Sequence, residues 1–484
     1  MNTVEPSLNK QILSLAIPAL GALIAEPLFV IIDSAMVGHL GRTELAGLSL
    51  ASTILTTIVG LCVFLAYATT ATTARLAGAG RTREALRAGI DGIWLALSLG
   101  VVLATGAWLS ANWLVHALGA TTDVATNAVA YLQASAPGLP GMLTVLAATG
   151  TLRGLLDTRS PFIVATIGAG VNAGLNAFLI YGLHLGVAGS GYGTALTQTL
   201  MAVVLCGLVA NGAHHHEVSI HPHRSGLGNA IVAGTPLLIR TVSLRIAMMT
   251  TVWAATALGA TALAAHQVVN SIWGFTAFAL DALAIAAQAL IGTHLGKKDA
   301  HEAKLSENDV LNGQSSRSAA AQLVTEEDTS FPSFDPHQPT TPHSQPPNID
   351  ALLRRFVMWG LGAGIALGLI LALFSSLLPR VFTPNNDVAH VASVSLLIIA
   401  VLMPLAGIVF LFDGLLIGAG DGHYLAIAGV ITLIPYLPIA IWIGLHPAST
   451  PAMSLGLLWL AFAGVFMGMR ALTTGLRVRA DAWR

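Results

Sequence analysis

The stretch from Pro18 to Gly41 reads PALGALIAEPLFVIIDSAMVGHLG and determines how the rest of the chain is interpreted. It belongs to an apolar run long enough to cross a bilayer, yet it contains two carboxylates, Glu26 and Asp33. An ionised carboxylate in hydrocarbon is costly unless it is paired, hydrated or protonated. A regular helix places residues seven apart on one face, and Pro27, with Pro18 before it, favours a bend. Titratable groups on a bendable membrane helix indicate a proton- or ion-coupled transporter.

The composition excludes a soluble domain. Hydrophobic residues make up 55% of the 484 residues and charged residues only 9%, with a mean hydropathy of +0.75. Soluble domains carry roughly 25% charged residues, so this chain cannot cover a water-facing surface. Cys62 and Cys206 both lie in apolar runs, which predicts neither a disulfide framework nor a metal site. The first apolar run is too long for a cleavable signal peptide. We expect an all-α integral membrane protein.

Apolar runs predict twelve transmembrane helices. The expected spans are 11–36, 46–74, 89–113, 128–149, 161–183, 189–211, 229–256, 263–290, 355–378, 390–412, 423–444 and 453–474.

The distribution of Lys and Arg predicts the orientation. Eighteen of the 22 fall at the two termini or in the loops after the second, fourth, sixth and eighth spans, a count that includes Arg153 and Arg470. The positive-inside rule then places both termini in the cytoplasm. We expect a multi-pass protein of the plasma membrane, the inner membrane in a bacterium.

The chain also repeats itself. A shift of 218 residues aligns Gly78 with Gly296, and further on a shift of 264 aligns Gly154 with Gly418. The shifts differ by 46, the length of a Ser/Pro/Gln-rich tract at 305–350. Such a tract buries too little apolar surface to offset its ordering entropy, which predicts a disordered cytoplasmic insertion.

Two lobes of six helices follow from the repeat. The predicted units are an N-terminal lobe at 1–213, a cytoplasmic loop at 214–225, and a C-terminal lobe at 226–304 and 351–484. Because six is even, both lobes enter the membrane in the same direction, related by a pseudo-twofold axis along the membrane normal. A cavity between such lobes suits alternating access.

The intramembrane charges do not repeat, which separates them from the fold. Asp33 aligns with Thr251, and Glu26 aligns with a leucine, so both acids are candidates for ion coupling. A hydrated acid near the outer end of the helix is the alternative for Asp33. Asn172 and Asn176 lie four residues apart on one helix face, as polar groups of a cavity or as interhelical hydrogen-bond partners.

The second half offers weaker candidates for a binding site: Arg240, His266, Gln267, Asn270, Asp281 and Asp413. Arg and Asp in lipid can pair to lower the cost of burial, a structural role. The tract HHHEVSIHPH at 214–223 is interpreted as a polar linker in preference to a metal site. The chain contains neither the phosphate-loop pattern of ATPases nor HExxH, and topology explains its basic loops without nucleic acid.

At this point the chain resembles a known family. The stretch from Pro18 to Gly41, followed by ELAGL, is similar to the first-helix signature of multidrug and toxic compound extrusion (MATE) transporters of the DinF-like branch. RGLLDTRSP at 153–161, LAAHQV at 263–268, ALDALA at 279–284 and FDGLLIGAGD at 412–421 also resemble that branch. The likeness covers nearly the whole chain except 305–350.

The resemblance implies a twelve-helix exporter of amphipathic, often cationic compounds, driven by entry of H⁺ or Na⁺. It implies that Asp33 is the coupling carboxylate and that Pro18 is the proline of helix bending. The family pattern on the fifth helix often has a carboxylate where this chain has Asn176. Glu26 then becomes the candidate for a second coupling acid.

The sequence therefore predicts a secondary antiporter that exports cationic small molecules by alternating access. No cofactor beyond the coupling ion is expected, and the partners are a small-molecule substrate and membrane lipid, with the chain a monomer. A lipid-linked-sugar flippase of related architecture is the main alternative, although it would need a strongly basic cavity. A receptor or an intramembrane enzyme is the second, but no nucleophile–base pair or metal cluster supports the enzyme.

Overall fold

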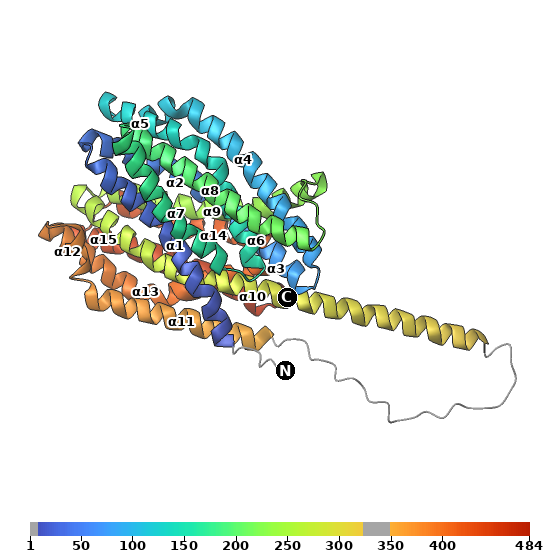
Figure 1. Ribbon diagram of the computed structural model, residues 1–484. Coiled ribbons are helices and arrows are strands. Elements are labelled where there is room, and N and C mark those ends of the chain that lie inside the picture. Colours follow the sequence, from blue (N-terminus) through green and yellow to red (C-terminus); the bar gives the residue numbers. More distant parts are fainter. Residues whose placement is uncertain (1–7, 323–348) are drawn as a thin grey trace.

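A computed structural model describes residues 8–322 and 349–484, and gives the backbone alone for Glu26 and for 307–322. Every regular element within the described ranges is helical (Figure 1). Eleven of these described helical segments are long and apolar enough to cross a membrane. The expectation of an all-α membrane protein is confirmed.

The first half of the chain forms one lobe and the second half the other, seen in Figure 1 as the blue-to-green and yellow-to-red helices. The first lobe contains α1 (Leu8–Gly38), α2 (Arg42–Leu61), α3 (Phe64–Gly78), α4 (Thr82–Ala117), α5 (Thr122–Ser135), α6 (Leu139–Gly154), α7 (Arg159–Ala177) and α8 (Gly186–His215). The second contains α9 (Arg224–Ala257), α10 (Ala260–Gln322), α11 (Ile349–Phe374), α12 (Leu378–Phe382), α13 (Asn386–Gly418), α14 (Gly422–Leu445), α15 (Pro451–Leu460) and α16 (Met467–Arg479).

Two predicted spans are interrupted. The span expected at 128–149 consists of α5 and α6, separated by a 3-10 turn at Ala136–Gly138 that contains Pro137. Proline removes a backbone donor, which explains why the regular helix stops there. The span expected at 46–74 consists of α2 and α3, which meet at Cys62. Together with the eleven candidate spans, the α5–α6 pair gives the predicted order of twelve crossings.

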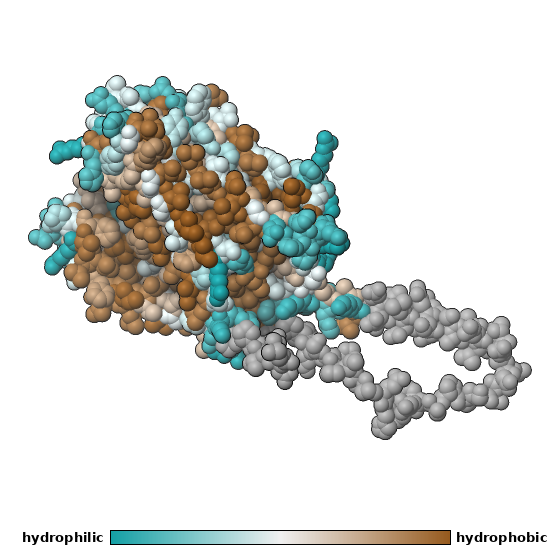
Figure 2. Space-filling model, viewed as in Figure 1, coloured by the Kyte–Doolittle hydropathy of each residue, from teal (hydrophilic) through white to brown (hydrophobic). Residues whose placement is uncertain are grey.

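The outer surface suits a bilayer. Figure 2 shows apolar side chains across the middle of the visible face, with polar ones gathered toward the ends of the helices. Large apolar side chains such as Val102, Leu373 and Val401 are more than half exposed. In water such a surface would aggregate, whereas in lipid it is solvated.

Glycines explain why the repeat is visible in the sequence. Helices α3 and α10 cross so closely that a Cβ added to Gly78 would lie 2.1 Å from the carbonyl oxygen of Thr293. The equivalent addition to Gly296 would lie 1.9 Å from the carbonyl oxygen of Arg75. Gly78 and Gly296, which the 218-residue shift aligns, therefore each pack against the helix that carries the other glycine, at the interface between the lobes.

Gly154 and Gly418, which the 264-residue shift aligns, make equivalent contacts within their own lobes. A Cβ added to Gly154 on α6 would lie 2.8 Å from the carbonyl oxygen of Thr70 on α3. A Cβ added to Gly418 on α13 would lie 2.4 Å from the carbonyl oxygen of Gln288 on α10. Thr70 and Gln288 are themselves 218 residues apart. The two shifts therefore relate the same helix pairs in the two lobes, and the two-lobe prediction is confirmed.

An alanine at position 296 should weaken the crossing of α3 and α10. Gly296→Ala places a Cβ against backbone, so we expect a loss of about 1–3 kcal/mol of stability together with reduced transport. Gly274→Ala, on the same helix with no atom within 4 Å of the added Cβ, is the matched control. Thermal denaturation of the purified variants measures the difference. Equal melting temperatures would contradict the close crossing.

An ion pair also joins the lobes near this crossing. Arg75 on α3 donates from Nε and Nη2 to Asp299 on α10, at 2.7 and 3.2 Å, and from Nη1 to the carbonyl oxygen of Ala419 at 3.2 Å. Both side chains are about 40% exposed, so the contribution to stability is small. These hydrogen bonds connect α3 of the first lobe to Asp299 and Ala419 of the second lobe at this end of the molecule.

The predicted insertion needs correction. Helix α10 continues to Gln322 and α11 begins at Ile349, so the part of 305–350 that is described is helical and not irregular. Residues 305–322 contain Ala, Leu, Gln and Glu but no proline, and adding residues to an existing helix is easier than starting one. The remainder of the predicted insertion, 323–348, lies outside the described residues.

Candidate functional site

Asp33 is the centre of a buried polar cluster in the first lobe. It lies on α1 and is 5% exposed. Three side chains from three other helices donate to its carboxylate. Asn176 on α7 donates from Nδ2, Thr194 on α8 from Oγ1 at 3.2 Å, and Tyr131 on α5 from its hydroxyl at 3.4 Å. Donors around a buried carboxylate stabilise its charged form.

The amides form a second layer of this cluster. The Nδ2 group of Asn176 also lies 3.2 Å from the Oδ1 of Asn172, whose own Nδ2 is 3.4 Å from Thr194 Oγ1. Both asparagines are fully buried. The Oδ1 atom of Asn176 is buried without a partner among the described residues, so one acceptor of the cluster is unused. The structure thus brings Asp33, Asn172 and Asn176 together.

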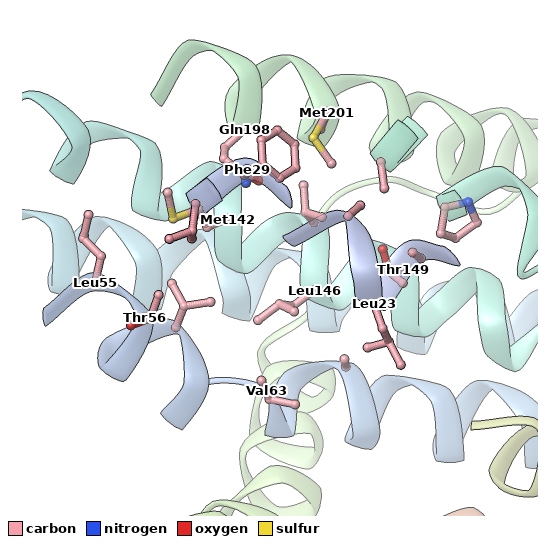
Figure 3. A pocket seen from close by; sticks show the side chains of 18 of the residues that line it. Leu23, Phe29, Leu55, Thr56, Val63, Met142, Leu146, Thr149, Gln198 and Met201 are labelled. Atoms are coloured by element: carbon pink, nitrogen blue, oxygen red, sulfur yellow. The ribbon is translucent and has the colours of Figure 1, made fainter. Parts of the chain in front are cut away.

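A cavity of about 220 Å³ extends from Asp33 through the first lobe. Figure 3 shows its wall, with Phe29 on α1, Leu55 on α2, Leu146 on α6 and Met201 on α8 directed into it. On each of α1, α6 and α8 the lining residues extend over eleven positions, which corresponds to about 16 Å of helix. The cavity is therefore long, mostly apolar and lined from several helices.

Charged residues lie at the end of the cavity away from Asp33. Arg153 on α6 and Asp281 on α10 line it there, with Tyr67 of α3 beside them. Arg153 is only 8% exposed. Its assignment to a cytoplasmic loop is therefore wrong: α6 extends to Gly154, so the guanidinium stays within the helical bundle. Asp281, predicted as a candidate of the second lobe, here contributes to the cavity of the first.

The second lobe contains a buried ion triad. Asp413 on α13 accepts from Arg240 on α9 and from Arg470 on α16, and all three are less than 10% exposed. The guanidinium of Arg240 also lies 5.6 Å from the ring centre of Tyr67. The placement of Arg470 in the C-terminal tail is wrong, because it lies within α16 and is buried inside the lobe. The pairing expected between Arg and Asp is present.

His266 belongs to a separate small hollow in the second lobe. It is 1% exposed, its ring stacks on Trp459 with 5.3 Å between centres, and neither ring nitrogen has a partner among the described residues. Asn270 and Thr251 line the same hollow of about 10 Å³, whereas Gln267 is exposed. His266, Gln267 and Asn270 are therefore not among the residues that line the cavity beside Asp33. They lie on α10 far from Asp281, the residue of that helix that reaches the cavity.

The remaining candidates are placed as follows. Pro18 and Pro27 lie within the continuous helix α1, and bending there stays a prediction. The side chain of Glu26 lies outside the described residues. The tract 214–223 spans the end of α8 and the loop before α9. No group of three metal-ligating side chains occurs anywhere in the described part of the chain.

Sequence reasoning missed two partners of Asp33, which are Tyr131 and Thr194, and one partner of Asp413, which is Arg470. Tyr and Thr are common on apolar helices, so nothing in their spacing marks them. Arg153 could have been found, because it continues the stripe of Met142, Leu146 and Thr149 on one face of α6.

Sequence comparison places this chain among transporters. A model of the MatE family matches residues 18–178, 236–308 and 344–442. Protein DETOXIFICATION 44, chloroplastic, from Arabidopsis thaliana is 26% identical over 99% of this chain and 83% of its own length. DNA damage-inducible protein F of Escherichia coli is 27% identical over 60% of this chain and 65% of its own. The probable multidrug resistance protein NorM of Acinetobacter baylyi is 27% identical over 60% and 66%.

The fold has a close counterpart among solved structures. The MATE transporter VcmN of Vibrio cholerae, in its bent form, superposes with a TM-score of 0.79 over 98% of both chains at 19% identity. The family model and the shared two-lobe fold agree with the motifs of α1 and of the α6–α7 connection. The chain therefore belongs to the MatE family of multi-pass membrane transporters.

Proposed function

We propose that this chain is a secondary antiporter that exports amphipathic cations in exchange for protons across the plasma membrane, with both termini in the cytoplasm. The observation that carries the proposal is the position of Asp33, a buried carboxylate at one end of a long apolar cavity. The cavity wall suits an apolar body, and the carboxylate suits a positive charge. The names of curated relatives, which include a probable multidrug resistance protein, support export of toxic compounds.

Proton uptake gives exchange through a single group. The ionised Asp33 attracts the substrate's cation, and a proton arriving from outside removes that attraction, so the substrate leaves. The side chain of Asn176 responds to the protonation of Asp33. Its Oδ1 has no partner among the described residues while Asp33 is ionised, and it accepts a hydrogen bond from the protonated Asp33 after the amide rotates. Protonation and substrate then favour different arrangements of the lobes, which is the requirement for coupling.

The hydrogen-bond directions favour H⁺ over Na⁺. The three groups around Asp33 all donate to it, whereas a sodium ion needs oxygen lone pairs directed at it. Among the described side chains of this cluster, Asp33 is the one carboxylate. A flippase for lipid-linked sugars is less well supported, because Arg153 is the one cation among the described residues of the cavity wall.

Transport of a fluorescent cationic dye into proteoliposomes tests the proposal. We expect a pH gradient alone to drive dye accumulation and a Na⁺ gradient alone to leave it at the level of empty liposomes. Accumulation driven by Na⁺ alone would overturn proton coupling. Absence of dye transport under both gradients would overturn the export function.

A second carboxylate at position 176 should change the ion response. Asn176→Asp places two acids side by side, and such a pair either shares a proton or binds a cation. We expect the variant to acquire Na⁺-driven dye transport that the wild type lacks. Asn112→Asp, on the exposed face of α4, is the control for an added charge. A Na⁺ response as low as that of the control would contradict this role for Asn176.

A further inference from the structure

The loop that joins the two lobes is bound along α4. Residues 216–223 connect α8 of the first lobe to α9 of the second. The indole Nε1 of Trp94 on α4 donates to the carbonyl oxygen of Ile220 at 2.9 Å. The backbone N–H of His223 donates to Oδ1 of Asp91, also on α4, at 3.0 Å. Asp91 is only 3% exposed, so a buried carboxylate of the first lobe holds the end of this loop.

Asp91 lies at the amino end of α9. His223 precedes the first turn of α9, and its own side chain does not cap that turn. A Cβ added to Gly226, in the same turn, would lie 1.8 Å from Oδ2 of Asp91. The unpaired backbone N–H groups at the start of a helix stabilise a negative charge placed there. A carboxylate of the first lobe therefore stabilises the start of a helix of the second.

The first turns of α9 have open space on two sides. A cavity of about 510 Å³ separates them from α3 and α4, and another of about 490 Å³ separates them from α3, α10, α13 and α14. Asn229 and Ala233 line both cavities. This end of α9 therefore has room to shift, and the contact with Asp91 opposes that shift.

The imidazole of His223 adds a titratable group to this contact. Its Nδ1 atom lies 3.9 Å from Oδ1 of Asp91, within the distance of an ion pair, and has no hydrogen-bond partner among the described residues. Histidine changes charge between about pH 5 and 8. A proton on His223 therefore places a cation beside the carboxylate and strengthens the contact.

The other charged groups of this region are exposed. Glu84 and Arg87 on α4 line the same cavity, and Glu84 is paired with Arg81. The side chains of α3 and α9 that line it are uncharged. In the loop, Glu217 pairs with Arg83 at 3.2 Å, and both are more than two thirds exposed. Exposed pairs contribute little, which leaves Asp91 and His223 as the groups through which pH acts here. The neighbouring charged or titratable residues that are also exposed are His214, His215, His216, His221 and Arg224.

We propose that Asp91 and His223 form a pH-sensitive latch that keeps the cytoplasmic end of the transporter closed. This rests on the proposed function, because it takes this end as cytoplasmic and the cycle as alternating access. Opening toward the cytoplasm moves α9 away from α4 and withdraws the amino end of α9 from Asp91. A proton on His223 is bound more favourably in the closed arrangement, so it shifts the equilibrium toward closure. An acidic cytoplasm thus favours the state that is open to the outside.

The distance between α4 and α9 tests the latch directly. Nitroxide labels on Arg87→Cys and Asn229→Cys, two exposed positions that line the cavity from either helix, report this distance in the full-length protein. Cys62 and Cys206 are replaced by alanine to keep the labelling specific. Double electron–electron resonance spectroscopy without substrate then gives the ratio of open to closed molecules.

Variants of the carboxylate contact should raise this ratio. We expect Asp91→Ala to raise it at least about tenfold, because hydrogen bonds to a charged group are lost. Gly226→Ala displaces the carboxylate without removing it and should also raise the ratio. Gly228→Ala, with no atom within 4 Å of the added Cβ, is the matched control. Ratios in Asp91→Ala and Gly226→Ala equal to that of Gly228→Ala would overturn the latch.

The response to pH tests the part played by His223. Lowering the pH from 8 to 6 should lower the ratio of open to closed molecules about threefold or more in the protein that carries only the labels. His223→Gln should reduce this response, whereas His221→Gln, an exposed histidine of the same loop, should retain it. Equal responses in the two variants would overturn the pH sensitivity. Neither result depends on transport, so failure of the proposed function shows separately, as absence of dye transport.

Discussion

Asp33→Asn is expected to abolish proton-coupled transport while leaving the protein folded. Asparagine preserves the size of the side chain. With its oxygen in the place of Oδ2 it still accepts from Thr194 and Tyr131, and its amide donates to Oδ1 of Asn176 once that amide rotates, so the cluster stays hydrogen-bonded. It cannot exchange a proton, and it removes the negative charge that attracts a cation. Proteoliposomes that contain a pH-sensitive dye report the effect, since addition of substrate should release protons from the wild type and none from the variant.

Asp123→Asn is the matched control for this substitution. Asp123 is an exposed carboxylate in the first turn of α5, and it is not among the residues that line the cavity. Its loss should leave proton release at the wild-type level. Substrate-driven proton release by Asp33→Asn equal to that of Asp123→Asn would refute the assignment. Comparable thermal denaturation of both variants and the wild type ensures that folding does not cause the difference.

The sequence predicts this site in part because helix geometry is local. Asn172 and Asn176 are four residues apart, so their common face follows from helical periodicity alone. Their contact with Asp33 is a different matter, because it joins α7 to α1 across 143 positions of sequence. Tyr131 and Thr194 reach Asp33 because α5 and α8 pack beside α1, and no sequence pattern within a single helix predicts that packing. The acid could be predicted, whereas its donors needed the tertiary structure.

The charges were harder to place than the helices. Gly78 and Gly296 recur in both halves because α3 and α10 must each let the other helix approach closely. The repeat can therefore be recognised in the sequence. Arg153 and Arg470 both lie within four residues of the ends of the predicted spans 128–149 and 453–474, and this proximity favours a cytoplasmic assignment. The extra helical turns that hold them inside depend on packing with α3 and α13. Arginine counts near helix ends therefore overestimate the cytoplasmic charge.

Asp413→Ala is expected to destabilise the second lobe by about 3–5 kcal/mol. The substitution leaves two buried guanidinium groups, those of Arg240 and Arg470, close together without their shared carboxylate. The cost comes from the uncompensated charges more than from the lost contacts. Thermal denaturation in detergent, followed by reaction of a fluorescent maleimide with Cys62 and Cys206 as they become exposed, should show a melting temperature several degrees lower. Glu84→Ala, which breaks an exposed pair with Arg81, should cost about 0.5 kcal/mol or less.

Replacement of the whole triad distinguishes structure from function. A buried ion cluster exchanged for apolar residues of similar volume is often neutral or stabilising. Arg240→Met, Asp413→Leu and Arg470→Met combined should therefore recover most of the stability that Asp413→Ala loses. Recovered stability together with wild-type transport of the fluorescent cationic dye would assign the triad to the fold alone. Stability that stays low in the triple variant would show instead that the ion pairs themselves, and not the avoidance of unpaired charge, hold α9, α13 and α16 together.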